Sequence, residues 1–393
     1  MKRILFVADG VAATGFRTVS HNIISNLPQE EYDIHHLAVN YFGDPHEFSW
    51  KIYPAFTGGD LLGIARLKQI ASAIKFDAIF ILNDIWLIDK YLEALKEIKI
   101  ELPKIIIYFP VDSSELENNW FKHMDIVQSI NVYTKFAQKE VILADESLNI
   151  NVIPHGIDTK TFFKLPMKRD DIKRVVFPQR EDLEDSFIVL NANRNQPRKR
   201  MDLTIEGFSL FAEGKPKNVM LYLHCGIIDT GFDIIRLARR YNIEDRLILS
   251  NLEMGTQKVS EQKLNYIYNA TEVGINTSFG EGWGLVNHEH AVTGAVQILP
   301  DHSACRELFN DCGVLIPIKY KLHNTDTLTL GSYISSEDIA SGLNKIYYDK
   351  EYYNKLSIKG FNKLSNEKYH WNNIVKKYWL PIFKEVTDGY NVA

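Results

Sequence analysis

The sequence predicts an α/β protein of two doubly wound, Rossmann-like domains that face each other across a cleft. At 393 residues the chain is too long for one typical hydrophobic core. Short apolar runs alternate with longer amphipathic ones in both halves, a pattern typical of parallel sheets covered by helices. A charge-dense, aperiodic stretch at residues 164–185 interrupts this alternation and is interpreted as a linker. We therefore expect one domain over residues 1–170 and a second over residues 171–371.

The expected strands are nearly continuous apolar runs, as in parallel sheets that are buried on both faces. In the first domain they are Ile4–Ala8, Ile34–Val39, Ala78–Leu82, Ile105–Phe109, Ile126–Ser129 and Asn151–Ile153. In the second domain they are Phe187–Asn191, Val219–Cys225, Arg246–Leu249, Val273–Asn276, Val296–Leu299 and Val314–Ile316. Helices are expected between them, near residues 17–27, 61–75, 89–98, 134–143, 201–213, 233–241, 260–269, 285–294 and 303–309. The tail reads as consecutive helices, with Pro381 as a kink or break in the last one.

Composition narrows the class of protein. The formal net charge is −5, so the chain as a whole is not the basic protein that nucleic-acid binding favours, although a local basic patch is compatible with it. Its three cysteines, Cys225, Cys305 and Cys312, show no paired spacing, which fits a reducing cytosol. No apolar run approaches the length of a membrane span. We expect a cytoplasmic protein, with peripheral membrane association left open.

A glycine-rich segment follows the expected strand that ends at Asn276. Glycines allow backbone N–H groups to approach a ligand closely, and a helix start adds further unpaired donors, so the segment suits phosphate oxygens. Glu281 lies in this turn, and Glu289 lies about two helical turns further on the same side. Their carboxylates are suited to pairs of sugar hydroxyls. The alternative is a structural turn with a helix-start glutamate. The predicted ligand-binding residues here are Gly280, Glu281, Gly282, Trp283, Gly284, Leu285 and Glu289.

A basic loop follows the first strand of the second domain. Residues 191–200 read NANRNQPRKR, with Asn193, Arg194 and Lys199 as the candidate ligand contacts. Four cations at the carboxyl end of a strand concentrate positive charge beside the proposed cleft, where a diphosphate would bind. A solvated loop or a nucleic-acid patch is the alternative.

Three positions in the first domain are candidates for the same cleft, because ligands of doubly wound sheets gather beyond the carboxyl ends of the strands. Gly15 lies in the loop after the first strand and permits close backbone approach, or it serves a tight turn only. Asp112 follows a buried strand and is a candidate contact to the acceptor or transferred sugar, or an N-cap of the next segment. His155, between Pro154 and Gly156, either faces the cleft or is a structural hydrogen bonder.

Several motifs are absent from the sequence. It contains no Asp-x-Asp triplet, no phosphate-binding G-x-x-x-x-G-K-[ST], no G-x-S-x-G and no H-E-x-x-H. If a diphosphate is the leaving group, cationic side chains and backbone amides must stabilise its charge in place of Mg²⁺. The prediction is a site that requires neither metal nor cofactor.

Taken in order, these pieces resemble the retaining glycosyltransferases of family 4, which have the GT-B fold. Glu281 and Glu289 match that family's E-x7-E pair, and Arg194 and Lys199 match its arginine and lysine after the first strand of the second domain. Pro154–Asp158 is similar to its P-N/H-G-I/V-D segment. Tyr369-His370-Trp371 resembles the F-S-W that opens the last helix. Asp112 lies in the region where many members have a histidine.

The resemblance implies a reaction and a role for each residue. The enzyme would move a hexosyl or pentosyl group from a nucleotide diphosphate sugar to an acceptor hydroxyl, with retention. Glu289 would bind the ribose, Glu281 the donor sugar, and Arg194 and Lys199 the diphosphate. The first domain would bind the acceptor, near Gly15, Asp112 and His155. The last helix, about residues 372–393, would cross back to that domain.

The identity of the acceptor stays open. A glycan, a lipid-linked compound or another hydroxyl compound fits the resemblance. A DNA-base or other nucleic-acid glycosyltransferase is an alternative that the basic loop would serve, and a nucleotide-sugar epimerase of the same fold is another. The acidic net charge weighs against DNA.

Overall fold

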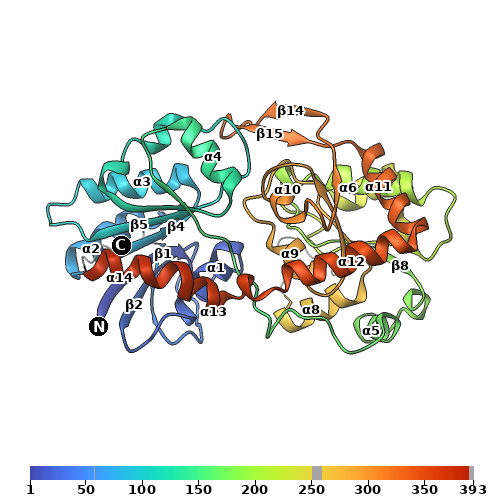
Figure 1. Ribbon diagram of the computed structural model, residues 1–393, viewed down its shortest axis with the longest axis horizontal. Coiled ribbons are helices and arrows are strands. Elements are labelled where there is room, and N and C mark those ends of the chain that lie inside the picture. The colour runs from blue at the N-terminus through green and yellow to red at the C-terminus, as the bar shows by residue number, and fades with distance from the viewer. Residues whose placement is uncertain (57, 250–258, 389–393) are drawn as a thin grey trace. The chain divides into compact units, whose positions relative to one another are not determined.

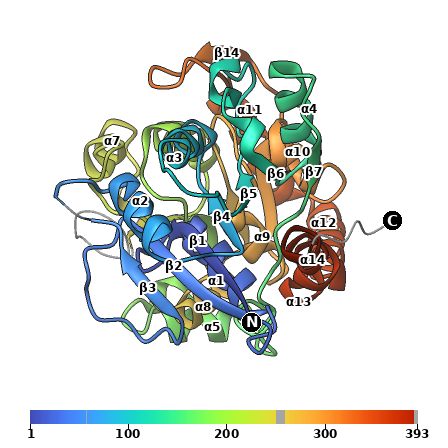
Figure 2. The same cartoon turned by 90° about the vertical axis from the view of Figure 1, so that its left-hand side faces the viewer.

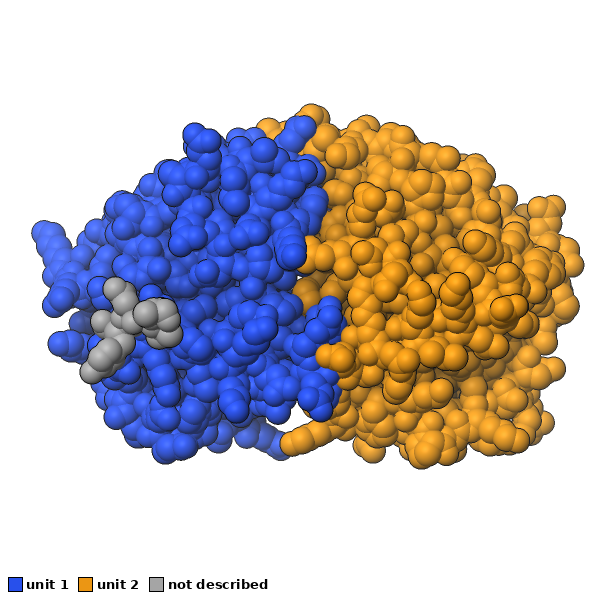
Figure 3. Space-filling view, in the orientation of Figure 1, with its two compact units in different colours: residues 1–156, 367–393 blue, residues 157–366 orange. Residues whose placement is uncertain are grey.

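The computed structural model divides the chain into two compact units (Figure 3) and describes residues 1–56, 58–249 and 259–388. Unit 1 comprises Met1–Gly156 together with Glu367–Ala393, and unit 2 comprises Ile157–Asn366. The first crossing of the chain comes at residues 156–157, earlier than the boundary at residue 170 that the sequence suggests.

Unit 1 is built on a seven-stranded parallel sheet in the order β3-β2-β1-β4-β5-β6-β7, with β3 and β7 at its edges (Figure 2). Its strands are β1 (Lys2–Asp9), β2 (Tyr32–Val39), β3 (Lys51–Pro54), β4 (Ala78–Leu82), β5 (Lys104–Phe109), β6 (Val127–Val132) and β7 (Ile150–Val152). The helices α1 (Gly15–Ser25), α2 (Ile64–Ala73), α3 (Ile85–Lys96) and α4 (Lys135–Ala144) connect them. The side chains of β1, β4 and β5 form the centre of the core.

Two strands of unit 1 differ from the prediction. β3 has no expected counterpart, because Lys51–Pro54 is a short edge strand of mixed exposure without an apolar run. β6 extends to Val132, beyond the predicted end at Ser129. Its extension includes Asn131, a buried residue whose side chain bonds the Ile107 carbonyl oxygen at 3.0 Å. A polar residue that is satisfied inside a sheet breaks the apolar run on which the prediction rests.

The C-terminal segment belongs to unit 1, as the resemblance implies. It comprises α13 (Trp371–Ile374), a π-helical turn at Val375–Trp379 and α14 (Leu380–Asp388) (Figure 1). The π turn lies directly before Pro381. Proline lacks an N–H and its ring crowds the carbonyl four residues earlier, which accounts for a π turn there, and the helix continues through Pro381 to Asp388. Trp379 packs edge-on against Tyr108 and Phe80, at centroid distances of 4.8 and 5.1 Å.

Unit 2 has a six-stranded parallel sheet in the order β10-β9-β8-β11-β12-β13. Its strands are β8 (Phe187–Asn191), β9 (Val219–Leu223), β10 (Leu247–Leu249), β11 (Val273–Ile275), β12 (Val296–Pro300) and β13 (Val314–Ile316). The strand order reverses between β8 and β11. In doubly wound sheets such a reversal separates the two neighbouring loops and creates a ligand site at their carboxyl ends.

The helices of unit 2 are α5 (Arg169–Val176), α6 (Met201–Ala212), α7 (Ile234–Arg240), α8 (Glu261–Ala270), α9 (Leu285–Ala291), α10 (Ser303–Phe309), α11 (Ser336–Tyr348) and α12 (Lys350–Leu364). A hairpin of β14 (Tyr320–His323) and β15 (Leu330–Tyr333), which the sequence does not predict, lies outside the main sheet. β14 is exposed along its whole length, so it lacks the alternation of polar and apolar residues that marks a half-buried strand.

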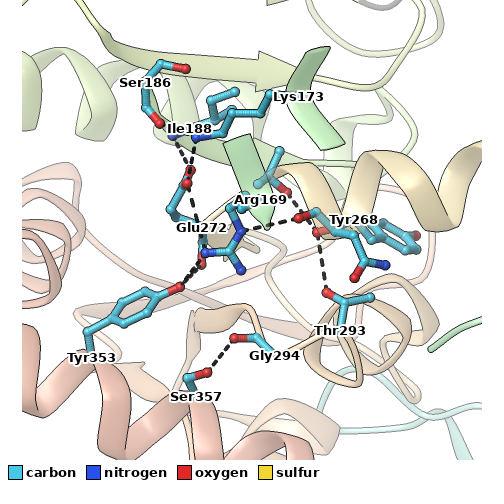
Figure 4. A network of polar contacts seen from close by, with 12 residues as sticks. Arg169, Lys173, Ser186, Ile188, Tyr268, Glu272, Thr293, Gly294, Tyr353 and Ser357 are labelled. Atoms are coloured by element: carbon cyan, nitrogen blue, oxygen red, sulfur yellow. Dashed lines mark hydrogen bonds and ion pairs between the residues drawn. The ribbon is translucent and has the colours of Figure 1, made fainter. Parts of the chain in front are cut away.

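The expected linker at residues 164–185 is wrong: this segment folds as part of unit 2. α5 buries Lys173, whose ammonium contacts the Ser186 carbonyl oxygen and lies 2.8 Å from the Glu272 carboxylate (Figure 4). Arg169 bonds the Tyr353 hydroxyl at 3.1 Å, and that hydroxyl donates to the Glu272 carbonyl oxygen (Figure 4). Two charges of this segment, Arg169 and Lys173, therefore serve a buried network, whereas Arg174 and Arg180 form exposed ion pairs.

None of the described helices is both long enough and apolar enough to span a bilayer.

Candidate active site

The strand reversal in unit 2 brings together the two segments that the sequence singles out. The basic loop leaves β8 at Asn191, and the glycine-rich loop leaves β11 at Ile275, on the same edge of adjacent strands. The Phe279 N–H donates to the Arg198 carbonyl oxygen at 3.0 Å, so the two backbones touch. Thr277 Oγ1 lies 2.9 Å from the Lys199 carbonyl oxygen and 2.8 Å from that of Arg200.

A buried ion pair lies at the centre of this edge. The Lys199 ammonium contacts the Glu281 carboxylate, and both side chains are almost entirely shielded from solvent. The Arg198 guanidinium lies 3.6 Å from the other oxygen of Glu281. Two cations from the β8 loop thus converge on one carboxylate from the β11 loop.

Neutral donors complete the surroundings of Glu281. Asn276 Nδ2 and Ser278 Oγ bond its carboxylate at 2.9 and 3.0 Å, and its backbone N–H donates to Ser303 Oγ at 3.0 Å. Burial alone would raise the pKa of Glu281, but the charges of Lys199 and Arg198 and the hydrogen bonds lower it to about 2. Burial lowers the pKa of Lys199, an effect that Arg198 reinforces and Glu281 opposes. Glu281 is therefore a fixed anion at neutral pH.

A chain of amides extends from the ion pair into the core. Asn276 Nδ2 also donates to Asn287 Oδ1 at 2.8 Å, and Asn287 Nδ2 donates to Gln297 Oε1 at 2.9 Å. Gly274 on β11 leaves room for this chain, because a Cβ there would lie 2.2 Å from Gln297 Oε1. The amides fix the orientation of each partner, since an amide flip would set donor against donor.

Glu289 lies on α9, is buried, and forms no ion pair with another described residue. Its carboxylate accepts a hydrogen bond from the Tyr268 hydroxyl at 3.0 Å. Burial raises the pKa of Glu289 to about 8, against the opposing effect of the Tyr268 bond. The two glutamates of the E-x7-E pair therefore carry different charges at neutral pH, one ionised and one protonated.

One position of the glycine-rich turn has a backbone conformation that favours glycine. Gly284 has a φ of +84°, in the left-handed region that favours glycine, and it precedes α9 directly. Gly280 and Gly282 are buried in the same turn, and Leu285 is the first residue of α9. The described contact of Trp283 is structural: its buried indole N–H donates to His288 Nδ1 at 3.2 Å.

Arg194, predicted to contact a diphosphate, is paired with a carboxylate in the structure. Its guanidinium forms two hydrogen bonds with the Asp229 carboxylate, at 2.6 and 3.0 Å. Asn193 is buried and bonds Asn191 Oδ1 through both its backbone N–H and its side-chain amide. Arg198, rather than Arg194, joins Lys199 at Glu281.

The three candidates of unit 1 occupy separate environments. Gly15 begins α1, whose N-cap is Thr14. Asp112 accepts a hydrogen bond from Ser113 Oγ at 3.0 Å, and the alternative of an N-cap is wrong because the next helical turn begins at Asn118. His155 is 3% exposed and packs against the ring of Tyr133, with centroids 4.0 Å apart.

The two segments of unit 1 that resemble the family motifs pack together. A Cβ on Gly156 would lie 2.6 Å from the Trp371 ring, and the His155 and Trp371 rings lie 5.9 Å apart. His155 is thus held among the aromatic rings of Tyr108, Tyr133 and Trp371.

Sequence reasoning missed several residues that shape the site: Arg198, Asn276, Ser278, Tyr268 and Ser303. The first three lie inside the two motifs, where neighbouring residues carry the resemblance. Tyr268 and Ser303 come from other elements, and their only signal is a position on α8 or after the end of β12. Ser303 adopts a φ of +46°, which places its hydroxyl against the Glu281 backbone and which no sequence pattern reports. Within the described residues, no group of three or more histidine, cysteine, aspartate or glutamate side chains is placed to hold a metal ion.

Comparison with known proteins adds one sequence relative and several structures. No protein-family model matches the chain. The mannosylfructose-phosphate synthase of Agrobacterium fabrum is 24% identical over 284 residues, which cover 68% of this chain. The match covers 56% of that protein, so the chain spans little more than half the length of this relative.

Solved structures match over nearly the whole chain. The sucrose-phosphate synthase of Thermosynechococcus elongatus superposes with a TM-score of 0.76 at 15% identity, over 99% of this chain and 100% of that chain. Anabaena HepE, solved in complex with UDP-glucose, has a TM-score of 0.71 at 15% identity, over 98% and 100%. The trehalose 6-phosphate synthase of Burkholderia multivorans has a TM-score of 0.70 at 13% identity, over 99% and 100%. With two parallel-sheet, Rossmann-like domains and these matches, the chain has the GT-B fold of glycosyltransferases.

Proposed function

We propose that the protein is a glycosyltransferase that moves a sugar from a nucleotide diphosphate sugar to an acceptor hydroxyl. The observation that carries the proposal is the buried contact of Lys199 with Glu281 at the strand reversal of unit 2. Loops at such a reversal are where doubly wound sheets bind nucleotides. The names of the relatives support transfer and not the nucleic-acid or epimerase alternatives.

The charges at this edge suit the bond that must break. Cleavage of the bond between the sugar and the diphosphate builds negative charge on the departing phosphate and positive charge on the sugar. Lys199 and Arg198 are proposed to stabilise the phosphate, and the ionised Glu281 lies where it can bond sugar hydroxyls and oppose the positive charge. Because hydrogen bonds hold these groups in place beforehand, little reorganisation is needed during the reaction.

Arg194 has a supporting role in this proposal. Asp229 holds its guanidinium in place and partly neutralises it, which leaves the remaining donors of Arg194 for a phosphate oxygen. We propose that Arg194 contacts the phosphate nearer the nucleoside, where less negative charge develops when the bond to the sugar breaks.

Glu289 is proposed to bind the ribose. A carboxyl group with a pKa of about 8 is protonated at neutral pH and can both donate to and accept from two neighbouring hydroxyls. The Tyr268 hydroxyl donates to one carboxyl oxygen of Glu289, which leaves the other oxygen for the ribose hydroxyls.

The remaining details are part of the same proposal. The reaction proceeds with retention, as in family 4, and without a metal ion. UDP-glucose is the first donor to test, because Anabaena HepE was solved with it. Unit 1 binds the acceptor.

A thermal-shift panel tests the proposal. UDP, GDP and ADP and their glucose and mannose derivatives are added to the purified chain with and without EDTA. A ligand at 100 times its Kd raises the free energy of unfolding by about 2.7 kcal/mol. The donor identified in this way is then incubated in radiolabelled form with candidate acceptors. Transfer of label in the presence of EDTA supports the proposal. Conversion of the donor to its epimer without transfer would support the epimerase instead, and no shift with any nucleotide would overturn the donor site.

A further inference from the structure

A second polar cluster lies in unit 1, beyond the carboxyl ends of β1 and β2. Two of its residues lie on α1, one lies on β2 and three lie in the segment between β2 and β3. We call it the histidine–tryptophan cluster, and it comprises Arg17, His21, His36, His46, Phe48 and Trp50.

Ring contacts hold the cluster together. The His21 ring meets Phe48 and Trp50 edge-on, with centroids 4.4 and 4.9 Å apart, and lies 6.0 Å from His36. The Arg17 guanidinium lies 5.6 Å from the centre of the Phe48 ring. Arg17 and His21 are four residues apart on α1, so their side chains share one face of the helix. Several elements thus direct polar side chains to one place.

Five nitrogen atoms of this cluster are buried and have no hydrogen-bond partner among the described residues: Arg17 Nε, His21 Nε2, His36 Nδ1, His46 Nδ1 and Trp50 Nε1. His36 is fully buried. Folded proteins leave few buried polar atoms unpaired, because each unpaired atom loses its bonds to water without replacement. Five such atoms in one cluster indicate a ligand that supplies the missing partners.

The chemistry of the five atoms selects the kind of ligand. The Arg17 and Trp50 nitrogens are donors in every protonation state. Burial lowers the pKa of His36 to about 3, and its Nε2 donates to the Ala8 carbonyl oxygen, so Nδ1 of this neutral ring is an acceptor. No carboxylate of the described residues forms an ion pair with Arg17. The acid at the end of β1, Asp9, is instead bonded by Thr14 at 2.6 Å and by Asn40 at 2.9 Å. Burial lowers the pKa of His21 to about 4, and the charge of Arg17 adds to this effect, so the His21 ring is uncharged at neutral pH.

We propose that the histidine–tryptophan cluster binds the phosphomonoester of a phosphorylated acceptor, with Arg17 and Trp50 donating to its oxygens. This inference rests on the proposed function, since it names the class of acceptor that the transferase uses. The side chains of Arg17, His21, His46 and Trp50 are half-buried, so the cluster adjoins the surface of unit 1 while its five unpaired nitrogen atoms are themselves buried. A phosphomonoester supplies three acceptor oxygens and up to two negative charges, which suit the Arg17 cation and the unpaired donors Arg17 Nε and Trp50 Nε1.

Isothermal titration of the full chain tests the inference. Fructose 6-phosphate and citronellyl phosphate, a short analogue of a lipid phosphate, are compared with fructose, and UDP is titrated separately. The variants are Arg17→Ala and Trp50→Phe, and Arg66→Ala is the matched control, because Arg66 lies on α2 of the same unit and bonds Gln69. Circular dichroism melting shows that each variant is folded.

We expect one phosphorylated compound to bind at least tenfold more tightly than fructose. Arg17→Ala should weaken that binding about tenfold or more and Trp50→Phe several-fold, whereas UDP binding and the Arg66→Ala variant stay within twofold of wild type. The compound that binds distinguishes a sugar phosphate from a lipid phosphate, and either supports the inference. Binding of UDP without binding of either phosphorylated compound would overturn it and leave the proposed function intact. Binding that neither variant weakens, or an Arg17-dependent affinity for a DNA oligonucleotide alone, would also overturn it. Failure of every nucleotide to bind would instead reject the proposed function.

Discussion

The polar groups at the carboxyl-end edge are hydrogen-bonded differently in the two parallel sheets. In unit 2, the polar groups beyond β8 and β11 bond one another. Glu281, for example, is contacted by Lys199, Asn276 and Ser278. In unit 1, the groups beyond β1 and β2 include buried nitrogens on Arg17 and Trp50 that have no partner among the described residues. The first arrangement is complete before any ligand arrives. The second leaves these nitrogens without partners among the described residues.

The difference follows from what each site is proposed to do. A site that stabilises charge in a transition state gains most when its dipoles are already oriented. A site that only captures a substrate can leave its donors unsatisfied, and the free energy they lack is recovered on binding. Substitutions in these groups should distinguish a complete hydrogen-bond network from an incomplete one.

The largest effect is expected for Lys199→Ala. Loss of this ammonium should lower kcat/KM by about 10² to 10³, the scale for removing one donor to a developing oxyanion. Removal of one partner of a buried ion pair should also lower the free energy of unfolding by about 3–5 kcal/mol. Steady-state kinetics and chemical denaturation measure the two effects.

Lys217→Ala is the matched control for that variant. Lys217 pairs with Asp245 at an exposed position of the same unit, where loss of an ion pair costs about 1 kcal/mol or less. Near-wild-type turnover in Lys199→Ala would remove Lys199 from the mechanism.

A pH dependence of stability is expected from Glu289. The folded protein holds this proton up to about pH 8, whereas the unfolded chain releases it near its ordinary pKa of 4.5. The protonated carboxyl therefore stabilises the fold below about pH 4.5, and this stabilisation is lost as the pH rises to about 8. Glutamine does not ionise, so the free energy of unfolding of Glu289→Gln should not fall with pH in this way. Between pH 5 and pH 8 it should therefore rise relative to that of wild type by on the order of a few kcal/mol.

Melting curves of the two proteins without ligand check this expectation. Parallel pH profiles would show that Glu289 is already ionised in the free protein. A donor that needs the carboxyl should in addition bind Glu289→Gln more weakly than wild type.

The amide chain can be interrupted at Gly274. In Gly274→Ala the new Cβ would lie 2.2 Å from Gln297 Oε1 and 2.6 Å from His290 Nδ1, so the chain from Asn276 to Gln297 must shift. Overpacking of this kind lowers the free energy of unfolding by about 1–3 kcal/mol. Gly360→Ala on α12 is the control, because its nearest neighbour would lie at an ordinary 3.6 Å and alanine favours a helix. Equal stability of the two variants would contradict the packing of the amide chain.

The smallest effect is expected for Arg194→Ala. Asp229 already neutralises part of this charge, and the Arg194 side chain is 45% exposed, so kcat/KM should fall about tenfold. Arg198→Ala should cost more, because Arg198 faces Glu281. A larger loss in Arg194→Ala than in Arg198→Ala would reverse the assignment of these two cations.

Much of the architecture could be predicted from the sequence, for reasons visible in particular strands. β4 and β8 are uninterrupted apolar runs between helices, and they occur at the predicted residues. The two loops of the site follow such strands, and their positions are a consequence of strand order. Polar strands gave no such signal: β14 is exposed throughout, and the end of β6 contains the buried Asn131.

The contacts inside the site were less accessible to prediction. The pairing of Arg194 with Asp229 joins residues 35 positions apart across two loops, and nothing in either loop specifies it. The burial of Lys173 against Glu272, 99 positions away, turns an apparent linker into part of the core. Charge patterns report where ionised groups occur but not which of them find partners in the interior.

The return of the chain to unit 1 after Glu367 has a consequence for biosynthesis. Trp379 and Phe383 pack on the rings of Tyr108, Phe80 and Phe6, which belong to the earliest strands. A ribosome makes these strands before unit 2 and their covering helix after it, so unit 2 can fold to completion while the core of unit 1 is still uncovered. The nascent chain therefore exposes an aromatic surface until Trp379 and Phe383 have been made, and a chaperone that shields such surfaces would act on the first unit, not the second.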